Sequence, residues 1–265
     1  MPIIWLTLLL AADAEPARLE WTVAGKQREA LIFRPGEKPT ADSALAATGA
    51  PVVFGFHGHG GTAQHAARTF RLQQLWPEAI VVYMQGIPTP GRLTDPEGKR
   101  TGWQHDAGDH DDRDLKFFDA VLTTLRTDYD IDENRVYATG HSNGAAFTYV
   151  LWAARGDLLA AVAPSAGSSR SIRSLKPKPA MHIAGRNDDL VRFPLQERTM
   201  QAVRVINGCE GAGKEWAKDC MLYASSKNAP FVAMIHDGGH KYPAEAPPLI
   251  VKFFQQHSGR AKDSK

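Results

Sequence analysis

The chain has 265 residues, 43% of them hydrophobic, so it is long enough to bury one substantial core. Its 31 Lys and Arg residues nearly balance its 29 Asp and Glu residues, with both signs scattered along the chain and a formal net charge of +2. This balance argues against nucleic acid or an anionic membrane surface as a partner. We expect one α/β domain over residues 15–258 and a short polar tail over 259–265.

Residues 1–14 predict a signal peptide remnant. The apolar run over residues 3–10 is too short to span a bilayer, and Ala12 and Ala14 fit the small-residue rule for cleavage before Glu15. No Lys or Arg precedes the run, which departs from the usual pattern. We expect a secreted or periplasmic protein, with a buried N-terminal strand as the alternative.

The first elements predict an α/β fold with a mostly parallel sheet. Residues 19–33 alternate apolar and polar side chains on both sides of Gly25-Lys26, which indicates an antiparallel hairpin at a sheet edge. Residues 51–56 and 79–85 are continuous apolar runs, typical of parallel strands buried on both faces. A helix is expected between them, over residues 63–76.

The first buried strand ends in His57-Gly-His-Gly-Gly61. Glycines at the carboxyl end of a parallel strand, just before a helix, let backbone N–H groups face a ligand. In acyl transfer, part of the oxyanion hole lies here, so the main-chain N–H of His59 is one expected donor. A purely structural glycine turn is the alternative.

The second buried strand leads into a long loop, residues 86–111. Loops of this length inside a compact domain are usually functional. We expect Trp103 to form a wall of an acyl or aryl pocket, although a tryptophan that packs in the core fits the sequence equally well.

A cluster of histidines and acids in this part of the chain suggests a metal site as an alternative. Its candidate ligands are His57, His59, His105, Asp109 and His110. Their spacings match no standard zinc or EF-hand pattern. Asp112 and Asp114 instead suit the N-cap and first turn of a helix over residues 115–125.

The turn Gly140-His-Ser142-Asn-Gly144 fits the pattern G-x-S-x-G. A strand-like run, 135–139, precedes it and a helix-like run begins at residue 145, which is the context that the pattern requires. The flanking glycines allow the backbone to approach closely on both sides, so the Ser142 hydroxyl is exposed near the positive end of a helix. The main-chain N–H of Asn143 is the second expected oxyanion donor.

Two further strands are expected, over residues 158–163 and 179–184. The second ends just before Asp188 and Asp189, where the acid of a catalytic triad belongs, and either residue could serve. A helix is expected over residues 194–207.

Cys209 and Cys220 enclose a short segment after this helix. An even number of cysteines in an exported chain predicts a disulfide, which over so short a loop would stabilise the fold by about 3 kcal/mol. Two reduced thiols are the alternative.

Strand-like runs over residues 220–224 and 230–235 lead to His240, on a loop before a final helix over 248–257. Of the ten histidines, His240 is best placed to act as a general base. The chain order of serine, acid and histidine is that of the α/β hydrolases.

From residue 51 to the last helix, the chain resembles the esterase family of poly(3-hydroxybutyrate) depolymerases, feruloyl esterases and acetylxylan esterases, within the α/β-hydrolase superfamily. The matching stretches are residues 57–61, 113–117, 135–144, 183–188 and 238–243. The family pattern selects Asp188 over Asp189 as the acid. This chain has His59 where the family commonly has Cys, and Tyr242 where it commonly has Trp.

The resemblance implies an α/β-hydrolase fold and a serine carboxylic-ester hydrolase that forms an acyl-enzyme without a cofactor. Ser142 would attack, His240 would be the base and Asp188 the acid, while the N–H groups of His59 and Asn143 would bind the oxyanion. The contrasting hypothesis is a metal-dependent hydrolase or metal-binding protein that uses the histidine cluster.

The resemblance also implies esters of polyesters or polysaccharides as substrates, and a small soluble ester is a further possibility. We expect Trp103, Phe193 and Tyr242 to line an apolar cleft beside Ser142, because all three follow the carboxyl ends of strands. No nucleic acid and no integral membrane contact are expected. The oligomeric state is left open.

Overall fold

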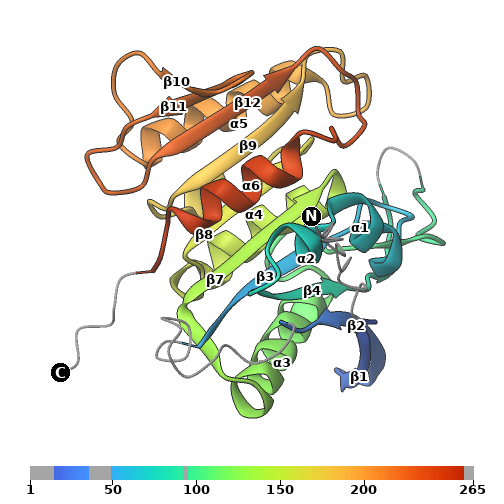
Figure 1. The fold of residues 1–265 in the computed structure, drawn as a ribbon. Coiled ribbons are helices and arrows are strands. Elements are labelled where there is room, and N and C mark those ends of the chain that lie inside the picture. Colours follow the sequence, from blue (N-terminus) through green and yellow to red (C-terminus); the bar gives the residue numbers. More distant parts are fainter. Residues whose placement is uncertain (1–14, 36–48, 92–94, 260–265) are drawn as a thin grey trace, which may run out of the picture.

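A single large sheet organises the part of the chain that the computed structural model describes, residues 15–35, 49–91 and 95–259 (Figure 1). Within these residues the sheet has ten strands, in the order β1-β2-β4-β3-β7-β8-β9-β12-β11-β10. It is the mostly parallel sheet that the sequence predicts, with the N-terminal hairpin at one edge.

Six neighbouring strands in the middle of this sheet are parallel. In spatial order they are β4 (Ile80–Met84), β3 (Ala50–Phe56), β7 (Ile131–His141), β8 (Ala161–Ser165), β9 (Ala180–Gly185) and β12 (Phe231–His236). The residues of β4, β8 and β9 are buried throughout, because helices cover both faces of the sheet.

Antiparallel strands form both edges. The N-terminal hairpin joins β1 (Ala17–Val23) to β2 (Lys26–Phe33), and β2 pairs with β4. At the other edge, β11 (Cys220–Tyr223) pairs with β12 and with β10 (Lys214–Ala217). The sequence did not predict β10. Its Lys-Glu-Trp-Ala run is short and half-exposed and has no apolar pattern, so its strand conformation depends on pairing with β11.

Three helices cover each face of the sheet (Figure 1). On one face lie α1 (Ala63–Phe70), α2 (Leu72–Leu75) and α6 (Ala246–Gln255), and on the other α3 (Arg113–Asp128), α4 (Asn143–Arg155) and α5 (Phe193–Ile206). The single helix expected over residues 63–76 is divided at Arg71. This residue has a φ of 48°, and its N–H closes α1 by donating to Ala67 O.

Short elements occupy the loops. They are β5 (Ile87–Pro88), β6 (Thr101–Gly102), η2 (Asp109–Asp112), η3 (Gly156–Leu158) and η4 (Ile172–Ser174). The strands β5 and β6 pair with each other, so the long loop that the sequence predicts folds back on itself.

A buried ion pair anchors the end of this loop. Arg28 on β2 donates to Asp114 at 2.7 Å, and both side chains are almost fully buried. Asp114 also accepts from Gln104 N at 2.7 Å. Asp112 lies at the N-cap position of α3, as expected, but its carboxylate accepts from Gly108 N and Gln104 instead of capping the helix.

The predicted disulfide between Cys209 and Cys220 is wrong. Both cysteines are free thiols, and they belong to hydrophobic clusters on opposite faces of the sheet. Burial raises the pKa of both thiols, that of Cys220 to about 11. Between the two cysteines the chain forms the strand β10, which the sequence did not predict.

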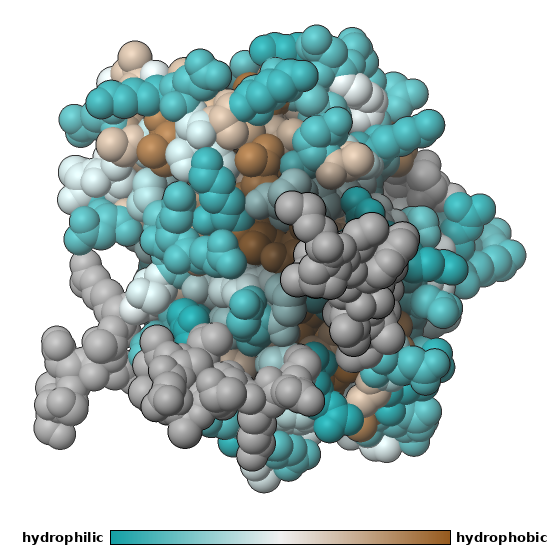
Figure 2. All heavy atoms as spheres, in the orientation of Figure 1, coloured by the Kyte–Doolittle hydropathy of each residue, from teal (hydrophilic) through white to brown (hydrophobic). Residues whose placement is uncertain are grey.

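The face of the molecule seen in Figure 2 is mainly hydrophilic, with hydrophobic side chains visible in patches. No helix among the described residues is both long and apolar enough to cross a membrane. The predicted signal segment, residues 1–14, and residues 260–265 of the predicted tail lie outside the described residues.

Candidate active site

Ser142 lies on the sharp turn between β7 and α4. Its φ of 57° and ψ of −117° are rare for a residue with a side chain, and its N–H donates to Ser165 O at 2.9 Å. A side chain at Gly140 would collide with the backbone of Gly144, and one at Gly144 would lie 2.6 Å from His57 O. The glycines are therefore required by close backbone contacts, as the sequence pattern predicts.

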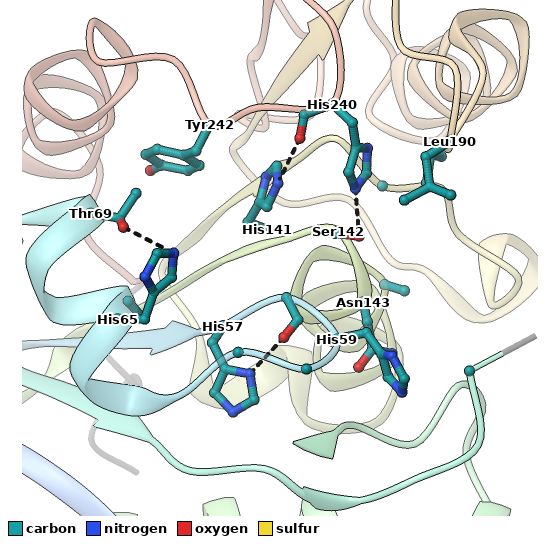
Figure 3. Close-up of a pocket in the computed structure, with 18 of the residues that line it drawn as sticks. His57, His59, His65, Thr69, His141, Ser142, Asn143, Leu190, His240 and Tyr242 are labelled. Carbon is teal, nitrogen blue, oxygen red and sulfur yellow. Dashed lines mark hydrogen bonds between the residues drawn. The ribbon is translucent and has the colours of Figure 1, made fainter. Parts of the chain in front are cut away.

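The structure brings Ser142, His240 and Asp188 into one hydrogen-bonded series (Figure 3 shows the first link). Ser142 Oγ lies 2.8 Å from His240 Nε2, and His240 Nδ1 lies 2.9 Å from Asp188 Oδ2. The Asp188 carboxylate is fully buried, whereas 19% of the His240 side chain is exposed. This arrangement can move a proton from the hydroxyl to the imidazole while the carboxylate stabilises the resulting charge.

Asp188 and its neighbour have different surroundings. Asp188 Oδ1 accepts from Leu190 N at 3.0 Å and from Val191 N at 2.8 Å, and Oδ2 accepts from Gln196 Nε2 at 2.9 Å. Asp189 is exposed. These three donors fix the orientation of the Asp188 carboxylate toward His240.

A buried chain of hydrogen bonds continues behind Asp188. Gln196 donates through Nε2 to Asp188 and to Val191 O, so its amide oxygen faces His182, whose Nε2 lies 3.3 Å away and donates to it. Burial lowers the pKa of His182 to about 4, so the ring is neutral and its Nδ1 accepts from Tyr149 Oη at 2.7 Å. From Tyr149 to His182, from His182 to Gln196 and from Gln196 to Asp188, each side chain donates a hydrogen bond to the next one.

No local sequence pattern pointed to this chain of three side chains. Tyr149 and Gln196 occupy ordinary helical positions, and only their packing in the tertiary structure brings them to the acid. His182 was the one available signal, because a histidine in a continuous apolar strand must find hydrogen-bond partners when buried.

His141, the variable residue before the serine, holds the loop that carries the base. Its Nε2 donates to His240 O at 3.0 Å, and its ring lies 5.1 Å from that of His240 (Figure 3). Burial lowers the pKa of His141 to about 4, so it is neutral near pH 7. The sequence analysis assigned it no role.

The turn over residues 57–61 packs directly against the serine. A side chain at Gly58 would lie 3.5 Å from Ser142 Cβ. His57 stiffens this turn, because its Nδ1 donates to Gly58 O at 2.7 Å and its Nε2 accepts from Gly86 N at 2.9 Å. Burial lowers the pKa of His57 to about 4. The N–H groups of His59 and Asn143 remain predicted oxyanion donors.

The histidine cluster proposed as a metal site is engaged elsewhere. His59 Nε2 donates to Thr89 O at 2.9 Å, and His105 Nε2 donates to Pro90 O at 3.1 Å. Across the described residues, no group of three His, Cys, Asp or Glu side chains is placed to hold a metal ion. The arrangement therefore does not favour the metal hypothesis.

The expectation that Trp103 lines a substrate cleft is wrong. The side chain is fully buried and stacks on Phe147, with ring centroids 5.2 Å apart, and its Nε1 donates to His57 O at 2.9 Å. The indole finds its polar partner in a backbone carbonyl and its packing in the core. Its backbone is paired with the Asn143 amide, which accepts from Trp103 N at 2.7 Å and donates to Trp103 O.

Phe193 is also misassigned, whereas Tyr242 is found in the cavity. Phe193 begins α5 and packs against the core, with the Arg186 guanidinium 5.6 Å from its ring, and it does not border the cavity beside Ser142. Tyr242 borders this cavity and stacks on Phe70 at 4.5 Å (Figure 3). Phe193 is the first residue of α5, and the helix directs its side chain toward the core. Its position after a strand did not indicate this direction.

The cavity in front of Ser142 has a volume of about 1160 Å³. Ser142 and His240 open onto it, together with the turn over residues 57–61 and part of α1. A reacting carbonyl carbon placed against the Ser142 hydroxyl would thus lie beside the backbone of both predicted oxyanion donors.

Comparison with known proteins finds relatives that include feruloyl esterases. A protein named probable feruloyl esterase C from Aspergillus clavatus is 28% identical over 198 residues, covering 71% of this chain and 69% of the relative. Feruloyl esterase D from Neurospora crassa is 26% identical over 161 residues, covering 58% of this chain and 54% of the relative. No protein-family model matches the chain.

Among solved structures, an acetyl xylan esterase from Aspergillus awamori superimposes with a TM-score of 0.68 at 15% identity, covering 90% of this chain and 99% of that one. None of the three relatives is a poly(3-hydroxybutyrate) depolymerase, and that part of the predicted resemblance stays a prediction. The chain has the α/β-hydrolase fold, and it resembles the feruloyl and acetylxylan esterases.

Proposed function

We propose that this chain is a serine carboxylic-ester hydrolase that works through an acyl-enzyme. The observation that carries the proposal is the series from Ser142 through His240 to Asp188, with links of 2.8 and 2.9 Å, at the wall of a cavity. The named relatives are feruloyl and acetyl xylan esterases, which supports ester hydrolysis as the reaction class.

In the first half-reaction, Ser142 Oγ attacks the ester carbonyl carbon while its proton moves to His240 Nε2. Asp188 stabilises the imidazolium, and the N–H groups of His59 and Asn143 stabilise the oxyanion, an effect of about 3–4 kcal/mol for one such donor. The tetrahedral intermediate collapses as His240 returns the proton to the leaving alcohol. Water then attacks the acyl-enzyme with His240 as base, which releases the acid and restores Ser142.

For the substrate we propose feruloyl or acetyl esters of polysaccharides, with polyester chains as the second class. The cavity of about 1160 Å³ can accept an aromatic acyl group together with part of a polymer. A panel of p-nitrophenyl acetate, methyl ferulate and hydroxybutyrate oligomers would rank these classes by kcat/KM.

The test of the mechanism is the Ser142→Ala variant. We expect kcat to fall by a factor on the order of 10⁶, as loss of a nucleophilic serine does, with the thermal unfolding midpoint nearly unchanged. In the unmodified protein, an organophosphonate should form a covalent adduct that mass spectrometry locates on Ser142. Appreciable turnover by the variant, or an adduct on Ser168 instead, would contradict the assignment.

We also propose that the protein is exported. The support comes only from residues 1–14, because the two free thiols remove the disulfide as a second argument. Fusing these residues to a reporter that is active only outside the cytoplasm would test export, and a reporter without activity would contradict it.

A further inference from the structure

The residues that border the cavity include four basic side chains and, among the described residues, no acidic one. Arg68 lies on α1, Arg100 just before β6, Arg170 after β8 and Lys241 directly after His240. All four side chains are exposed. They come from four separate segments that converge on one opening.

This distribution does not follow from the composition of the chain. With 31 basic and 29 acidic residues in the full sequence, a cavity lined by chance would carry both signs. The Asp188 carboxylate lies behind His240 with no exposed surface, so it presents no charge to the opening.

Three of the four cations have no acidic partner. Within the part of the chain that the structure describes, no carboxylate lies within 4.0 Å of the charged groups of Arg68, Arg100 or Lys241. Arg170 lies 3.5 Å from Asp106, and both of these side chains are well exposed, so this pair is weak.

Some arginines elsewhere on the surface do have acidic partners. Examples are Arg18 with Glu29, Arg126 with Glu133, and Arg155 with Asp119, at 2.8–2.9 Å. The Arg100 side chain packs on Gly60 in the turn that carries His59, and its backbone N–H donates to Asp95 Oδ2 at 2.7 Å. Its guanidinium forms no ion pair with that carboxylate, and the residue is exposed at the border of the cavity.

Converging cations attract anions, and a concave surface concentrates their field. Arginine in particular binds carboxylates through paired hydrogen bonds. We propose that the cavity selects esters whose acyl or alcohol part carries a carboxylate. The carboxylate could belong to an acidic sugar unit beside the ester or to the free-acid end of an oligoester. This inference rests on the proposed function.

Two matched pairs of substrates test the inference and distinguish the two sources. p-Nitrophenyl hydrogen adipate against p-nitrophenyl hexanoate places the carboxylate on the acyl side, and 4-acetoxybenzoate against 4-acetoxybenzamide places it on the alcohol side. After correction for spontaneous hydrolysis, we expect kcat/KM for the anionic member of at least one pair to be about 10-fold higher at low salt. Screening in 0.5 M NaCl should remove most of this preference.

Variants of the cavity cations sharpen this test. Replacing Arg68, Arg100 and Lys241 together with glutamine should abolish the anionic preference, whereas Arg18→Gln on the distant edge strand β1 should preserve it. Equal kcat/KM within both pairs for the unmodified protein would overturn the inference. A preference that survives in the triple variant would overturn it as well.

A binding measurement separates this inference from the proposed function. Calorimetry with 4-acetamidobenzoate and 4-acetamidobenzamide, which an esterase does not cleave, should show tighter binding of the anion. If no ester is hydrolysed but the anion binds more tightly, the proposed function fails and the charge selectivity stands. If esters are hydrolysed, the two amides bind equally and kcat/KM is equal within both substrate pairs, the charge selectivity fails and the proposed function stands.

Discussion

Two histidines at the carboxyl edge of the sheet differ in what their ring nitrogens contact. His240, after β12, lies between the Ser142 hydroxyl and the Asp188 carboxylate. His57, after β3, lies between a backbone carbonyl and a backbone N–H. The first pair of partners can exchange a proton with the ring, and the second cannot.

The role of each histidine therefore depends on the two partners of its ring more than on its position in a loop. His240 keeps part of its ring exposed to the cavity, where a substrate can reach it. Burial holds His57 neutral, with a pKa of about 4, and its two hydrogen bonds make it a structural brace for the turn beside Ser142. The predictions that follow test this contrast.

The first prediction concerns the acid that orients His240, where the expected loss is second only to that of Ser142→Ala. Asp188→Asn should lower kcat by a factor of about 10⁴, because the imidazole then loses both its working tautomer and its counter-charge. Asp189→Asn, on an exposed side chain, should leave kcat within about 2-fold, as surface substitutions away from such features usually do. Steady-state kinetics of the two variants would measure this, and similar losses in both would show that the acid is misassigned.

The second prediction concerns the buried neutral histidines His57, His141 and His182, whose pKa burial lowers from 6.5 to about 4. The unfolded chain gains a proton at each of these sites as pH falls below 6.5, and the folded protein does not. Stability is therefore complete above pH 6.5 and falls toward pH 4, by roughly 1.4 kcal/mol per pH unit for each histidine.

Urea unfolding at pH 7.5, 6.5, 5.5 and 4.5 would measure this slope. The two aspartates with lowered pKa values, Asp95 and Asp112, act only below their ordinary value of 3.8 and so leave this range unaffected. A free energy of unfolding that stays constant from pH 6.5 to 4.5 would show that these rings become charged without cost.

The third prediction concerns the chain of donors behind the acid. Gln196→Met keeps the length of the side chain but removes the donor to Asp188 Oδ2, so we expect kcat to fall about 10-fold with KM nearly unchanged. Gln201→Met, on an exposed position of the same helix, is the matched control. A rise in KM or a fall in thermal stability, without a change in kcat, would assign Gln196 a purely structural role.

The smallest expected effect is at the histidines that were candidate metal ligands. Incubation with EDTA should leave kcat/KM unchanged, and His105→Gln should change it by less than about 2-fold, because its ring bonds a backbone carbonyl at 3.1 Å. Loss of activity in EDTA, restored by adding zinc, would revive the metal hypothesis.

Local sequence patterns predicted the elements with strong periodicity. The parallel strands β3, β4 and β12 are mainly apolar runs, and close backbone contacts require the glycines around Ser142. These features depend on residues close together in the chain, so their signal survives in the sequence.

Residues whose role depends on long-range packing could not be assigned in this way. Trp103 and Phe193 follow strand ends as pocket residues do, yet each side chain turns to the core, where it buries more surface. The Tyr149, His182 and Gln196 chain joins a helix, a strand and a second helix, and no spacing rule links them.

Short sequence patterns predicted the central parallel strands, the serine turn and the candidate base, because each pattern has a direct steric or chemical reason. The residues alone left Asp188 and Asp189 open, and the family pattern favoured Asp188. Tertiary contacts were needed to show that Asp188 faces His240, that Cys209 and Cys220 lie on opposite faces of the sheet, and that four cations converge on the cavity. These three features depend on the direction in which each side chain points from the folded backbone. Strand pairing and helix packing set that direction.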